Sequence, residues 1–118
     1  MVQTILVVED NPVLAELARD NLRLRGMEVH AATNAPDALA MIREGLVPDV
    51  LFSDIVMPGA FDGYELAVTV RMQHPDMCIL LTTGWVVPEY SPFEVLTKPY
   101  SVEELYGWLD ANQRGEVC

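Results

Sequence analysis

Two acidic residues, Glu9 and Asp10, lie side by side in the stretch VVEDNP, directly after an apolar run. Each carboxylate makes its neighbour harder to ionise, so the pair is unfavourable unless a cation shares its site. Mg²⁺ is a hard cation with oxygen ligands and is commonly held by one or two carboxylates. Carboxylates before a helix also act simply as caps or as partners of the helix dipole. The pair alone is more typical of that structural role, so other residues must decide.

Three further polar residues, Asp54, Thr83 and Lys98, each follow or end another apolar run. Asp54 taken alone could begin a turn, and Thr83 could be an ordinary hydroxyl at the end of a strand. Lys98 and Pro99 could belong to a solvated loop, but Lys98 is the only lysine in the chain. Its position is therefore not explained by a surface that is generally rich in lysine. Whether these residues form a site depends on the elements that position them.

Five apolar runs have the length and composition of buried strands. Each is rich in Val, Ile, Leu or Phe, as expected for strands that are covered on both faces. The runs are QTILVV (3–8), MEVHAA (27–32), PDVLFS (48–53), MCILLT (77–82) and FEVLT (93–97).

Helix signals lie between these runs and after the last one. They are Asn11 before Pro12, Asn34 before Pro36, and the capping boxes Asp62/Glu65 and Ser101/Glu104. Strands that alternate with helices predict a doubly wound α/β fold, with a parallel sheet of order 2-1-3-4-5 between two helix layers. The length predicts one domain over residues 1–118, with a core from about 3 to 112 and a polar tail at 113–118.

This fold brings the polar residues together. The carboxyl ends of parallel strands meet at one edge of the sheet, and ligands of such sheets bind there. Glu9 and Asp10 follow the first strand, Asp54 the third and Lys98 the fifth, while Thr83 ends the fourth. The convergence of three acids, one hydroxyl and one ammonium at one crevice favours a functional site.

The motifs around these residues resemble those of one family. They are VVEDN at 7–11, SDIVMPG at 53–59 with DG at 62–63, TTG at 82–84 and TKP at 97–99. In this order and spacing they are similar to the receiver domains of two-component response regulators, over essentially the whole chain. The resemblance implies a flavodoxin-like fold of the CheY type. MPGAFDG, TTGW and KPYS are closest in character to receivers of hybrid sensor histidine kinases or single-domain response regulators.

The resemblance implies a metal site. Glu9, Asp10 and Asp54 are the implied acidic ligands, and the backbone carbonyl of Val56 is the implied further protein ligand. The implied ion is Mg²⁺, with Mn²⁺ as an alternative. Three clustered carboxylates create a negative field that such a cation relieves, which accounts for the adjacent Glu9 and Asp10.

The resemblance also implies phosphoryl transfer. Asp54 is the implied phosphoacceptor, a nucleophile that forms an acyl phosphate with a phosphoryl group from a histidine kinase or a histidine phosphotransfer protein. Lys98 is the implied phosphate-binding residue. Thr83 is the implied switch hydroxyl, preferred to Thr82 because the family's hydroxyl directly precedes a small residue, here Gly84. The domain would catalyse its own phosphorylation and dephosphorylation and would not otherwise be an enzyme; its downstream partner is not specified.

Two features depart from the family's pattern. Receivers usually carry Tyr or Phe three positions before the lysine, as a switch coupled to the hydroxyl, but this chain has Val95 there. For the nearby aromatic residues Trp85, Tyr90 and Phe93, a packing role is the better interpretation.

The second departure is the interval of fourteen residues between Thr83 and Lys98, which includes Pro88 and Pro92. Such a short, proline-containing interval predicts that helix four of the family is shortened to about one turn or missing.

Charge and composition exclude several other functions. Eighteen acidic residues against seven basic ones give a net charge of −11, which disfavours binding to nucleic acid or to an anionic membrane. The chain has no apolar run of the ~20 residues that span a bilayer and no basic signal region at its start, so a cytoplasmic location is expected.

Three alternatives remain open at this level. The chain could be an interaction module that is not phosphorylated, a pseudo-receiver, or a flavin-binding domain of the same architecture. A phosphatase with an aspartyl nucleophile is the third, but its second acid is expected two positions after the nucleophile, where this chain has Val56.

Overall fold

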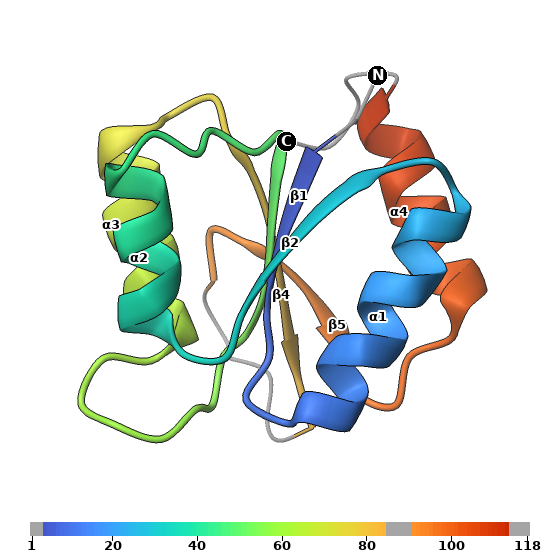
Figure 1. Ribbon diagram of the computed structural model, residues 1–118, viewed down its shortest axis with the longest axis horizontal. Coiled ribbons are helices and arrows are strands. Elements are labelled where there is room, and N and C mark those ends of the chain that lie inside the picture. Colours follow the sequence, from blue (N-terminus) through green and yellow to red (C-terminus); the bar gives the residue numbers. More distant parts are fainter. Residues whose placement is uncertain (1–3, 85–90, 114–118) are drawn as a thin grey trace.

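A computed structural model describes residues 4–84 and 91–113 of the chain. Five parallel strands form its central sheet (Figure 1). They are β1 (Thr4–Val8), β2 (Glu28–Ala32), β3 (Val50–Asp54), β4 (Cys78–Thr83) and β5 (Glu94–Thr97). The strand order β2-β1-β3-β4-β5 confirms the predicted sheet and its topology.

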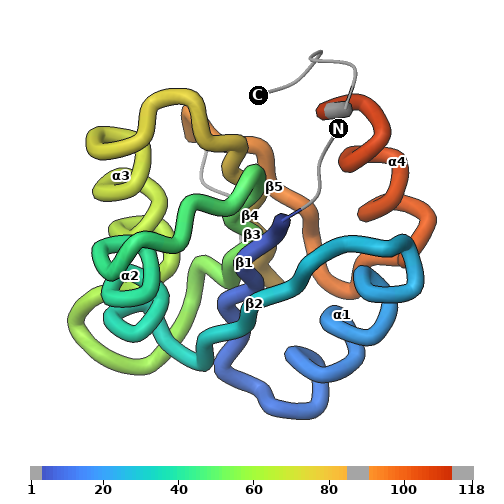
Figure 2. Tube along the Cα trace, turned by 45° about the horizontal axis from the view of Figure 1, so that its top comes forward, coloured from blue at the N-terminus to red at the C-terminus, as the bar shows by residue number. Residues whose placement is uncertain are grey.

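Within the described residues, four helices cover the sheet, two on each face (Figures 1 and 2). They are α1 (Pro12–Leu24), α2 (Ala35–Arg43), α3 (Gly63–Gln73) and α4 (Val102–Gln113). α1 and α4 lie on one face, and α2 and α3 lie on the other. The predicted three-layer, doubly wound α/β fold is therefore confirmed.

The helices begin where capping groups satisfy their first backbone N–H groups. Asn11 Oδ1 accepts hydrogen bonds from the backbone N–H groups of Val13 and Leu14, at 3.0 and 3.3 Å. Asp62 and Glu65 form the predicted capping box at the start of α3. The cap of α1 also fixes where the segment that carries Glu9 and Asp10 joins the helix.

Alternate residues of the strands fill two apolar layers. Leu6 and Leu51 belong to the layer under α2 and α3, whereas Ile5, Val7 and Phe52 belong to the layer under α1 and α4. All five residues of β3 are buried, Asp54 included. The core therefore encloses the end of β3 between both helix layers.

The segment between β4 and β5 is described only at its two ends. Residue 84 and residues 91–93 are not helical. The prediction that helix four is shortened or missing concerns mainly residues 85–90. These residues lie outside the described part of the chain. Among the helices of the described part, none is long and apolar enough to cross a membrane.

Candidate functional site

The carboxyl ends of β1, β3 and β5 bring three charged side chains into direct contact. The Lys98 Nζ lies 2.7 Å from Glu9 Oε1 and 2.7 Å from Asp54 Oδ1. Glu9 and Asp54 are buried, at 7% and 5% exposure, while the Lys98 side chain keeps 24% of its surface exposed. One ammonium group thus bridges two buried carboxylates at the edge of the sheet.

Burial changes how these groups ionise. Burial and the neighbouring Glu9 carboxylate raise the pKa of Asp54 to about 8, against the opposite effect of Lys98. Burial alone would raise the pKa of Glu9, but hydrogen bonds with Asp54 and Lys98 lower it to about 2. The two carboxylates therefore titrate as a pair that retains one proton near neutral pH, beside the charged Lys98.

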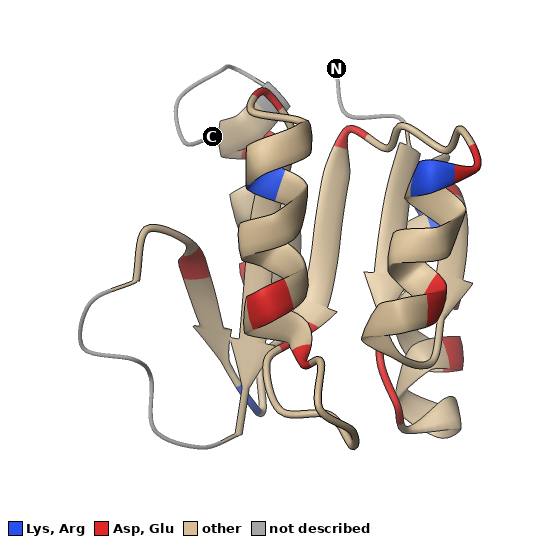
Figure 3. Ribbon diagram, turned by 90° about the vertical axis from the view of Figure 1, so that its left-hand side faces the viewer, with Lys and Arg blue, Asp and Glu red and all other residues tan. Residues whose placement is uncertain are grey.

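A third acid completes the set, hereafter the carboxylate cluster. Carboxylate oxygens of Glu9, Asp10 and Asp54 lie within 4.8 Å of one another, and Asp10 is exposed to solvent. Hard oxygen donors with one open side fit Mg²⁺, which retains several waters when bound. Val56, whose backbone carbonyl is the further implied ligand, is 55% exposed in the loop just beyond β3. Most of the charged residues coloured in Figure 3 are Asp or Glu, so the electrostatic field of the molecule also favours binding of a cation.

Both threonines at the end of β4 are buried. Thr83 is 3% exposed, and its backbone carbonyl accepts a hydrogen bond from the Lys98 N–H at 2.8 Å. Thr82 is 4% exposed and is the register partner of Asp54 in the sheet. The backbone of β4 therefore joins the segments that carry Asp54 and Lys98.

Gly63 has a positioning role that the sequence did not reveal. A Cβ atom at this residue would lie 1.6 Å from the Asp54 backbone oxygen, far inside any real contact. The Gly63 N–H also donates to the Ile55 carbonyl at 2.9 Å. The pair DG at 62–63 was the only signal in the sequence, since the close approach of α3 to β3 exists only in the fold.

The aromatic residues near Val95 do not all fall within the described part of the chain. Phe93 is buried, and its ring packs edge-on against Tyr64 with 5.7 Å between centroids. This contact indicates core packing. Trp85 and Tyr90 lie outside the described residues.

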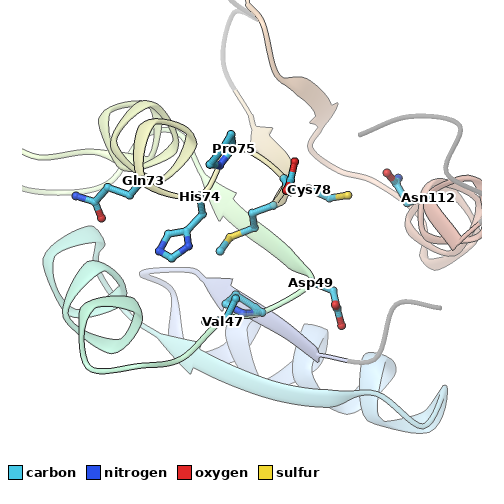
Figure 4. Close-up of a pocket in the computed structure, with 10 residues that line it drawn as sticks. Val47, Asp49, Gln73, His74, Pro75, Cys78 and Asn112 are labelled. Atoms are coloured by element: carbon cyan, nitrogen blue, oxygen red, sulfur yellow. The ribbon is translucent and has the colours of Figure 1, made fainter.

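A separate cavity of about 530 Å³ lies at the opposite, amino-terminal edge of the sheet (Figure 4). Its lining includes Val47, Asp49, His74 and Pro75 but none of the predicted site residues. Asp49 accepts a hydrogen bond from the Thr4 N–H at 2.9 Å, which is a structural role. The carboxylate cluster is therefore the better candidate for chemistry.

The protein has a doubly wound α/β fold with acids and one lysine at the carboxyl edge of its sheet. Proteins of this class bind ligands at that edge. The family model of the response regulator receiver domain matches residues 5–109. The chain belongs to this family, which confirms the resemblance found in its motifs.

Solved receiver structures are similar over nearly the whole chain. Chemotaxis protein CheY4 of Vibrio cholerae is 28% identical, with a TM-score of 0.82, and the match covers 93% of this chain and 98% of that one. The receiver domain of hybrid histidine kinase CckA is 30% identical, with a TM-score of 0.78, and the match covers 91% and 95%. A histidine kinase receiver domain from Syntrophus aciditrophicus is 26% identical, with a TM-score of 0.84, and the match covers 96% and 91%.

Proposed function

We propose that the chain is a phosphoacceptor that receives a phosphoryl group on Asp54 from a histidine kinase or a histidine phosphotransfer protein, in a Mg²⁺-dependent reaction. The observation that carries this proposal is the position of Asp54. Its buried carboxylate ends β3 within 2.7 Å of the Lys98 ammonium and beside two further acids. Family membership supports the same reading.

In the proposed reaction, an Asp54 carboxylate oxygen attacks phosphorus while the bond from phosphorus to the donor's histidine nitrogen breaks. Lys98 already contacts Asp54 and can follow the new phosphoryl oxygens with its ammonium group. Mg²⁺, held by the carboxylate cluster and the Val56 carbonyl, would screen the negative charge of the transferring group. The Thr83 hydroxyl would then donate a hydrogen bond to a phosphoryl oxygen. This new contact would draw the segment after β4 toward the site and so change the conformation of the domain.

The direct test uses the wild-type chain and a small phosphodonor such as acetyl phosphate. Intact mass spectrometry should show the gain of one phosphoryl group with Mg²⁺ and no gain with excess chelator. The label should be released by hydroxylamine, as an acyl phosphate is. A chain that remains unmodified with Mg²⁺ would instead support the unphosphorylated interaction module, and a yellow, flavin-loaded protein would support the flavin-binding alternative.

An apolar groove beside the carboxylate cluster suits the protein donor. It has a volume of about 340 Å³ and lies between α1 and the start of α4. Its apolar lining comes from Leu14, Leu17, Ala18, Pro99, Val102 and Leu105, and Glu9 and Lys98 border it. Because the groove shares these two residues with the site, a helix seated in it would bring a phosphohistidine close to Asp54.

Leu17→Glu should therefore separate docking from chemistry. Leu17 is 57% exposed, so the substitution is compatible with folding. Phosphotransfer from a kinase or phosphotransfer protein that modifies the wild type should slow by about tenfold or more, because a charge replaces a central apolar contact. The rate with acetyl phosphate should not change.

The matched control is Leu24→Glu, on the same helix. Leu24 is 83% exposed and does not line the groove, so both donors should react at the wild-type rate. Equal loss in the two variants, or slower reaction of Leu17→Glu with acetyl phosphate, would contradict the docking proposal but not the phosphorylation of Asp54.

A further inference from the structure

One buried hydroxyl beside the carboxylate cluster has no hydrogen-bond partner. Thr82 is 4% exposed, and its Oγ1 finds no partner within the part of the chain that the structure describes. Nearly all buried polar atoms in folded proteins bond to protein or to ordered water, so each exception requires an explanation. The sequence had favoured the adjacent Thr83 and left Thr82 without a role.

The register of the sheet places Thr82 next to Asp54. Asp54 of β3 and Thr82 of β4 are Cα partners, so their side chains leave the sheet on the same face. Phe52 and Leu80, two residues earlier on each strand, belong to the apolar layer under α1 and α4. Thr82 therefore faces α1 and α4, the side on which Lys98 and Glu9 border the groove.

A small cavity adjoins Thr82 on this face. Its volume is about 10 Å³, which is close to the smallest space that holds one water molecule. Glu9, Thr82 and Tyr100 are its polar lining residues, and the others are apolar. A buried water needs two to four polar partners, and three of the residues that line this cavity carry polar side chains.

We propose that this cavity binds one water molecule, through which the Thr82 hydroxyl is hydrogen-bonded to the Glu9 carboxylate. Thr82 is then a positioning residue for the carboxylate cluster. Glu9 already accepts from Lys98 Nζ at 2.7 Å and from the Asn11 N–H at 3.2 Å. A carboxylate can accept further bonds, and an additional one restrains its orientation.

The consequence concerns metal binding. Groups that orient a metal ligand without touching the metal commonly change its affinity by about tenfold to a hundredfold when removed. Because the role acts through Glu9, it does not depend on phosphorylation of Asp54. The proposal therefore stands or falls separately from the proposed function.

Thr82→Val is the first test because valine keeps the shape of threonine and removes its hydroxyl. Titration calorimetry with Mg²⁺ should show binding weaker by about tenfold, whereas Thr82→Ser, which keeps the hydroxyl, should remain close to wild type. Thr69→Val, on α3, is the matched control and should bind as the wild type does. Wild-type affinity in Thr82→Val, or equal losses in the Val and Ser variants, would overturn the proposal.

A second test needs no metal. In chelator, Thr82→Val should raise the equilibrium constant for unfolding by about fivefold in the wild-type background, the usual effect of losing one buried hydrogen bond. In a Glu9→Gln background the same change should have a clearly smaller effect, since the two residues share the water. Equal effects in both backgrounds, or greater stability of Thr82→Val, would show that the hydroxyl makes no bond to Glu9.

Discussion

Asp54→Asn should abolish phosphorylation and, in the absence of metal, stabilise the fold near neutral pH. The carboxamide is not a nucleophile for phosphorus, so the intact mass should remain unchanged with acetyl phosphate and Mg²⁺. The stability gain arises because the folded wild type keeps Asp54 protonated beside Glu9 at a pH where the unfolded chain ionises it, a cost that asparagine does not have. We expect a gain of about 2 kcal/mol in the free energy of unfolding.

The pKa shifts of Asp54 and Glu9 determine how this stability difference changes with pH. The pKa of Asp54 rises from 3.8 to about 8 on folding, so the folded chain resists its ionisation and loses stability as pH rises through this window. Glu9 acts in the opposite sense, because its pKa falls from 4.5 to about 2 and its stabilising contribution is lost only as pH falls through that lower range. The free energy of unfolding of Asp54→Asn should therefore exceed that of the wild type by an amount that grows from mildly acidic to neutral pH.

Urea denaturation in chelator at several pH values measures this difference. Asp76→Asn is a suitable control because Asp76 is exposed to solvent near the opposite edge of the sheet. The free energy of unfolding of this variant should equal that of the wild type at every pH. A phosphoryl group on the Asp54→Asn chain would refute the assignment of the phosphoacceptor. A wild-type stability curve in that variant would refute the account of the buried pair.

The sequence predicted the elements of this fold because their signals are local. Buried parallel strands are short apolar runs, and all five predicted runs overlap the observed strands with ends that differ by at most two residues. Asn34 caps α2 as predicted, and the helix begins directly after it at Ala35. Strand order followed from the rules for crossover connections, which constrain how neighbouring strands are wound.

The details of the site could not be predicted in the same way because they depend on contacts between distant segments. Glu9 and Lys98 are 89 residues apart, and nothing local indicates that one ammonium bridges Glu9 and Asp54. The opposite pKa shifts of Glu9 and Asp54 depend on burial and on their mutual contacts, which the sequence does not specify. Thr82 was also missed, since only the register with Asp54 shows which face its hydroxyl occupies.

Gly63→Ala should be strongly destabilising, although local preference predicts the opposite. Helices favour Ala over Gly, by about 1 kcal/mol in their interior and by less at their first residue, which is the position of Gly63 in α3. Here, however, the new Cβ would lie 1.6 Å from the Asp54 backbone oxygen and 2.6 Å from its carbonyl carbon. Both atoms are backbone, so either α3 or the end of β3 must move. We expect a loss of about 3 kcal/mol or more in the free energy of unfolding, because overpacking against buried backbone outweighs helix propensity.

Urea denaturation of Gly63→Ala and Gly107→Ala gives the matched comparison. Gly107 lies in α4, and a Cβ there meets nothing within 4 Å, so this control should gain up to about 1 kcal/mol from helix propensity alone. Where Gly63→Ala still folds, the displaced end of β3 should also slow phosphorylation of Asp54 by acetyl phosphate, while Gly107→Ala reacts normally. A Gly63→Ala chain as stable as Gly107→Ala would mean that α3 does not press against Asp54, and the positioning role of Gly63 would be wrong.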